Sequence, residues 1–180
     1  MSHIDDFANG LFEEAKRFFE KAQDATEDKA KDAYLHGALM LAFCALEAHV
    51  NAIGDDFLTR PEVSVHDKGV LLEQEVRLQN GEFKLQPSLK ITRLEDRVQF
   101  LHFRFSGKPL NRSETWWADL SAALKLRNRL THPKDILITK EKEVGKAIQA
   151  VIDTLDALYQ AIYKRKFPPR DRGMRSRMDF

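Results

Sequence analysis

The sequence predicts an all-α fold, an antiparallel bundle of about five helices with a small β-hairpin inserted. Apolar residues recur at steps of three and four over several long segments, which is the pattern of amphipathic helices. One segment is apolar on nearly all sides, as a central bundle helix is. A single Asn-Gly dipeptide, flanked by alternating polar and apolar residues, predicts a hairpin turn.

Length and composition favour one soluble domain. The chain has 180 residues, 43% hydrophobic and 32% charged, with a single Cys. That length allows a sizeable core, and one Cys excludes a disulfide framework or a Cys-based zinc site. The longest apolar run, residues 37–46, falls short of the roughly 18 residues of a membrane span. We therefore expect a cytoplasmic protein with no membrane partner.

The first two helices are predicted over about 2–25, capped by Ser2, and over 27–57. Residues 33–53 of the second helix include only four polar ones, which places it at the centre of the bundle. Pro61 opens an irregular region, in which Ser64 caps a short helix ending near residue 72. The hairpin follows at about 75–86, around Asn80-Gly81.

Three more helices complete the predicted bundle. One begins near residue 89 or 92 and ends at 105. The next covers 114 to about 131, capped by Ser113 and stopped by Pro133, and the last covers 140 to about 164, capped by Thr139. We expect Pro168-Pro169 to end the fold, so that 1–163 form the bundle and 164–180 a tail.

The predicted tail is the basic part of the chain. It holds seven basic and two acidic residues, a net charge of +5, which leaves −4 for the rest because the whole chain carries +1. The tail is either a solvated terminus or a phosphate-contacting segment. The basic residues of the tail are its best candidates for phosphate contact, and the first three of them are Lys164, Arg165 and Lys166.

Polar residues on apolar faces indicate a site. Arg127 continues the stripe of Leu120 and Leu124, and a guanidinium there needs an anionic partner or an interface. Glu47 and Asn51 share one face of the second helix, four residues apart. We predict a cluster of Glu47, Asn51 and Arg127, whose alternative interpretation is a structural ion pair.

Arg127 is followed five positions later by His132. Because Pro133 disfavours helical backbone at the preceding residue, His132 should leave the helix and turn towards the face of Arg127. An imidazole that titrates near pH 6.5 and a permanent cation suit phosphodiester cleavage. Similar spacings occur in a loop, from Arg60 to His66, and inside a continuing helix, from Arg97 to His102.

The run Arg127-Asn128-Arg129-Leu130-Thr131-His132, just before the last long helix, resembles the motif of the HEPN family (higher eukaryotes and prokaryotes nucleotide-binding). Those domains are helical bundles. Their motif is Arg, a polar residue, a short spacer and His. Many also carry an acidic residue in an early helix, and Glu47 is similar to it. The resemblance covers about half the chain and excludes the hairpin region.

The resemblance implies a metal-independent, cofactor-free endoribonuclease that acts as a dimer, with both motifs lining one cleft. His132 is then the general base or acid, Arg127 stabilises the scissile phosphate, and Asn128 and Glu47 orient them. The RNA-contacting residues we expect are these: Asn51, Arg129, Lys134, Lys164, Arg165 and Lys166.

The resemblance also implies a toxin or an abortive-infection ribonuclease, with an antitoxin protein as a possible partner. One toxin subgroup has Tyr two positions after the His; here Lys134 stands there, so regulation of that Tyr is not expected. Two alternatives stay open. One is a non-catalytic module that binds a nucleotide, RNA or a protein, and the other is a purely structural bundle.

Other candidates are weaker. His3, His49, His66 and His102 lack the paired spacing of metal ligands. His36 fits a satisfied core histidine, and Cys44 is expected to be buried and inert. Of Trp116 and Trp117, we expect one in the core.

Overall fold

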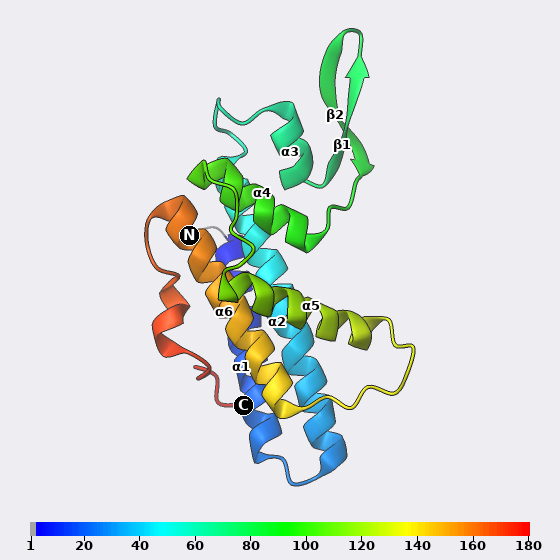
Figure 1. Cartoon of the computed structure of the whole chain (residues 1–180), viewed down its shortest axis with the longest axis vertical. Helices are drawn as coiled ribbons and strands as arrows, with labels where there is room; N and C mark the ends of the chain where they lie inside the picture. Colours follow the sequence, from blue (N-terminus) through cyan, green and yellow to red (C-terminus); the bar gives the residue numbers. More distant parts are fainter. Residues whose placement is uncertain (1–2) are drawn as a thin grey trace.

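The computed structural model describes residues 3–180 and shows a mostly helical protein with one two-stranded sheet (Figure 1). It has six α-helices rather than about five, because the short helix after Ser64 is a full element. In chain order the elements are α1 (His3–Asp24), α2 (Asp28–Phe57), α3 (Val65–Leu71), β1 (Gln74–Gln79), β2 (Glu82–Leu89), α4 (Leu94–Ser106), α5 (Thr115–Thr131), α6 (Glu141–Tyr163) and the 3-10 helix η1 (Pro168–Arg172).

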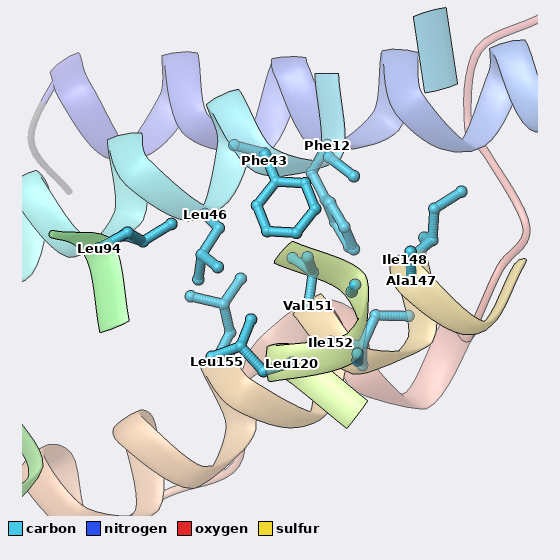
Figure 2. Packing of buried hydrophobic residues seen from close by; sticks show 14 of the residues in the cluster. Phe12, Phe43, Leu46, Leu94, Leu120, Ala147, Ile148, Val151, Ile152 and Leu155 are labelled. Atoms are coloured by element: carbon cyan, nitrogen blue, oxygen red, sulfur yellow. The ribbon is translucent and has the colours of Figure 1, made fainter. Parts of the chain in front are cut away.

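The core lies between α1, α2 and α6, with α5 crossing over them (Figures 1 and 2). Phe12 of α1, Leu46 of α2, Leu120 of α5 and Ile152 of α6 are all fully or almost fully buried there. Burying such side chains contributes about 1.5–3 kcal/mol each. The apolar stripe predicted for α6 lies in this core. In α1 the buried rings are Phe12 and Phe19, whereas Phe7, which the three- and four-residue spacing placed on the inner face, is 64% exposed.

The bundle is not wholly antiparallel, which corrects the expectation. Lys31 and Glu141, near the starts of α2 and α6, form an ion pair at 2.8 Å. Near their ends, the Tyr163 hydroxyl donates to the Asp56 carboxylate at 2.6 Å. These two helices therefore run parallel. Short connections fix antiparallel neighbours only for consecutive helices, whereas five elements separate α2 from α6.

Helix bounds lie within a few residues of the predicted ones, but two predicted caps are wrong. The N-caps of α5 and α6 are Glu114 and Lys140, and neither makes a side-chain capping bond. Thr139 is buried instead, with its hydroxyl 3.0 Å from the ring nitrogen of His36. Ser64 does cap α3, in a capping box with Asp67. The predicted cap Ser2 lies outside the described residues.

The predicted hairpin is present. Gln79 pairs with Glu82 across Asn80 and Gly81, whose φ angles of 53° and 84° fit a type I′ turn. Strand β2 continues to Leu89, beyond the predicted end of the hairpin, so α4 begins only at Leu94. The hairpin packs on α3 and projects from one end of the bundle (Figure 1).

The fold does not end at Pro168-Pro169, as the sequence suggested. Phe167 is 1% exposed, and its ring meets those of Phe12, His49 and Tyr159. After this anchor the chain runs back along α1. Basic residues of the tail pair with carboxylates of the bundle: Arg170 with Asp156, and Arg172 with Glu13 at 3.3 Å.

One strip of α2 faces outward. The helix is long and apolar enough to cross a membrane, but 61% of its apolar window is buried inside the protein. The outward strip includes Met40 and Leu41, which are partly buried, and Cys44, which is exposed. Cys44 is therefore not the buried thiol that the apolar sequence around it indicated.

Acid should destabilise the protein through His49. The ring is 1% exposed, and burial lowers its pKa to about 4. An unfolded imidazole titrates near pH 6.5, so between these values the unfolded state binds more protons. The free energy of unfolding should fall by about 3 kcal/mol as the pH drops from about 7 to about 4.

Urea unfolding curves of the wild type and of His49→Leu measure this contribution. The variant should lose that part of the pH dependence, because leucine takes up no proton. The same pH dependence in both proteins would contradict the assignment.

Candidate active site

Helix α5 carries the candidate motif, and burial of one face fixes its rotation. Leu120, Ala123 and Leu124 are each at most 5% exposed. Arg127 continues this stripe at the edge of the core, where its side chain is 22% exposed. Its guanidinium lies over the ring of Phe43, with the central carbon 5.4 Å from the ring centroid.

The structure brings Arg127 and Glu47 together. The Arg127 Nη2 atom lies 3.7 Å from the Glu47 Oε1 atom, an ion pair too long for a hydrogen bond. The Glu47 side chain is half exposed, so this is not a buried pair. The Arg127 Nε atom is buried and has no hydrogen-bond partner. The guanidinium is therefore held in place without being saturated by protein acceptors.

Asn51 does not join this pair, contrary to the expectation. It accepts a hydrogen bond of 2.6 Å from Arg97 of α4. Among the arginines that the structure describes, Arg97 is the buried one, with 5% of its surface exposed. It also forms an ion pair with Glu73 at 3.5 Å. Burial lowers the pKa of Arg97, and the negative charge of Glu73 offsets part of this shift. This contact ties the hairpin region to α2.

His132 stands at the end of α5, outside the helix. Its backbone angles, φ −130° and ψ 63°, are not helical, as Pro133 predicted. Its backbone N–H still donates to the Asn128 carbonyl at 2.9 Å. The imidazole is exposed and contacts no hydrogen-bond partner among residues 3–180. It is therefore available to an external group.

Within one protomer, Arg127 and His132 line neighbouring hollows rather than one. Arg127 and Asn128 line a hollow of about 420 Å³. Asn128 and His132 line another of about 620 Å³. Asn128 thus belongs to both. The expected turn of the His132 ring into the hollow of Arg127 is not seen.

The predicted RNA-contacting residues divide into two groups. Arg129 and Lys134 line the hollow of His132. Lys164, Arg165 and Lys166 follow the end of α6, which lies at the Asp56 end of α2.

The second group is far from the hollow of His132. Pro133 lines a hollow together with His36, near the start of α2. Because His36 and Asp56 are twenty residues apart on one helix, about 30 Å separates the two places.

Sequence reasoning missed two contributors. Arg93 lines the hollow of Arg127, and Lys125 lines that of His132. Lys125 had a detectable signal, since it precedes Arg129 by four residues and so shares its helix face. Arg93 had none, because it reaches the site only through the placement of α4. As expected of one tryptophan, Trp117 is buried.

Comparisons with known protein families, with curated proteins and with solved structures found no match for this chain.

Replacing Arg97 should lower the free energy of unfolding much more than replacing Arg127 does. Arg97→Ala leaves Asn51 and Glu73 without a buried partner and should cost about 2–4 kcal/mol of unfolding free energy. Arg127→Ala removes a half-exposed ion pair and should cost about 1 kcal/mol or less. Urea unfolding of both variants checks this. A large loss at Arg127 would support the purely structural interpretation of its pair with Glu47.

Proposed function

We propose that this protein is a metal-independent endoribonuclease of the HEPN type, acting in the cytoplasm as a toxin or defence ribonuclease. The observation that carries the proposal is the pair of hollows joined at Asn128. One holds a guanidinium beside Glu47, and the other holds an exposed imidazole without a partner. These are the groups that phosphodiester cleavage requires.

In the proposed reaction the His132 imidazole removes the proton of a ribose 2′-hydroxyl. The 2′-oxygen then bonds to phosphorus, and the bond from phosphorus to the 5′-oxygen breaks. The leaving oxygen takes a proton from water. The products are a 2′,3′-cyclic phosphate and a 5′-hydroxyl. Arg127 stabilises the negative charge that builds up on the phosphoryl oxygens.

Glu47 and Asn128 position the groups that react. The Glu47 carboxylate keeps the Arg127 guanidinium over Phe43, at a distance that leaves its N–H groups able to donate elsewhere. Asn128 lies between the two hollows and can orient a phosphate that contacts both.

A homodimer is part of the proposal. Ile136 and Ile138, in the loop after His132, are 94% and 75% exposed. Large apolar side chains exposed together indicate an interaction surface. A two-fold interface here would bring the Arg127 of one protomer towards the His132 of the other. An antitoxin protein that covered the same loop would block the site.

Cleavage should depend on the two motif residues. Purified wild-type protein should cut mixed single-stranded RNA in the presence of EDTA and leave 2′,3′-cyclic phosphate ends. His132→Ala should lower the rate by about 10²–10⁴, the usual contribution of a general acid or base. Arg127→Ala should also lose activity while keeping the fold.

His66→Ala serves as a control, because His66 is exposed and makes an edge-to-face contact with Phe83 of the hairpin. It should cleave like the wild type. Undiminished cleavage by His132→Ala would reject the assignment.

Mixing two inactive variants tests whether the site is shared between protomers. In a mixed dimer of Arg127→Ala and His132→Ala, one composite site keeps both side chains. Random mixing should then restore about a quarter of the wild-type rate, since half of the dimers are mixed and one site in two is intact. If each protomer works alone, mixing restores nothing.

The alternative is a non-catalytic module that binds RNA, a nucleotide or a protein. The separation of Arg127 and His132 into two hollows of one protomer favours it if no dimer forms. RNA binding without cleavage by wild-type protein would support that function.

A further inference from the structure

We infer that single-stranded RNA follows α5 beyond the His132 hollow and that Lys125 and Lys146 bind its phosphates. The inference rests on the proposed function, because it extends the same site. It places the phosphate-binding surface on α5 and the start of α6, not on the tail, where the sequence concentrates positive charge.

Two adjoining hollows define the path. The hollow of His132, about 620 Å³, is also lined by Lys125 and Arg129. The next hollow, about 280 Å³, shares Lys125 and Arg129 and adds Lys146 of α6. The shared residues show that the two hollows adjoin, so a chain that leaves His132 passes Lys125 and Arg129 on its way to Lys146.

The cations along this route are free. Within the described part of the chain, Lys125, Arg129, Lys134 and Lys146 form no ion pair and no side-chain hydrogen bond. Both lysines of the inference are exposed. Unpaired cations can neutralise phosphates without first breaking an internal contact, which favours binding here.

Carboxylates limit the path. Asp135 lines the first hollow, and Asp119 and Glu143 line the second. Positive charge therefore exceeds negative charge by two in the first hollow and by one in the second. The attraction weakens away from His132, which fits a short flanking segment of RNA rather than a long bound strand.

Four of the seven basic side chains of the tail already have partners within the protein. Arg170 and Arg172 are paired with Asp156 and Glu13. The Lys164 ammonium donates to the Ala161 carbonyl at 2.7 Å. Arg165 lies over the rings of Tyr159 and Tyr163. Binding RNA with these four groups would therefore cost internal contacts.

The lining also predicts how the RNA is recognised. Neither hollow contains Phe, Tyr or Trp, so bases have no aromatic platform to stack on. Contacts are then made to the phosphates, and binding should depend little on sequence and strongly on salt.

The test measures binding separately from cleavage. All proteins carry His132→Ala, and fluorescence anisotropy follows a labelled single-stranded RNA of mixed sequence over a range of salt concentrations. Adding Lys125→Ala and Lys146→Ala should weaken binding. It should also flatten the slope of log K against log salt by about 1.4, since each phosphate contact to a single strand contributes about 0.7.

The control is Lys84→Ala with Lys90→Ala, which makes the same change in net charge on the exposed hairpin region. It should leave the slope unchanged. Equal slopes for the Lys125/Lys146 variant and its parent would overturn the inference, and so would an equal loss in the control. Failure of the proposed function would be seen differently: the wild-type protein would bind this RNA but would not cut it.

Discussion

The burial of one face of α5 against α2 and α6 decides where the residues of the candidate motif lie. With Leu120, Ala123 and Leu124 in the core, Arg127 must emerge at the edge of α2, beside Phe43 and Glu47. Pro133 then ends the helix, and the residue before it leaves helical geometry. The site is thus a consequence of ordinary packing plus one proline, and it needs no strained backbone.

The guanidiniums of Arg97 and Arg127 both contact the outward side of α2. Their surroundings differ, and so do the roles that we assign to them. Arg97 is buried and fully engaged by Asn51 and Glu73, so it joins α2 to α4 and the hairpin region. Arg127 has one long contact to Glu47 and remains partly exposed. A cation that is held but not saturated suits an external phosphate, whereas a saturated one suits architecture.

Much of the fold was predictable, because helix periodicity, the Asn80-Gly81 turn and the Pro133 stop are local signals. The parallel course of α2 and α6 was not, since distant helices carry no mark of their relative direction. Arg97 shows a similar limit. It shares a face with Leu94 and Leu101, as Arg127 shares one with Leu120 and Leu124, so periodicity alone could not say which would be buried. The docking of Phe167 depended on a pocket built by other helices.

In the proposed reaction His132 and Arg127 act on one phosphate. A crystal structure of the protein with an RNA whose 2′-hydroxyls are methylated, and which therefore cannot be cleaved, tests it most directly. We expect one backbone phosphate in contact with a His132 imidazole and an Arg127 guanidinium, supplied by two protomers. A phosphate bound elsewhere, with these two side chains each free of it, would rule out the shared site.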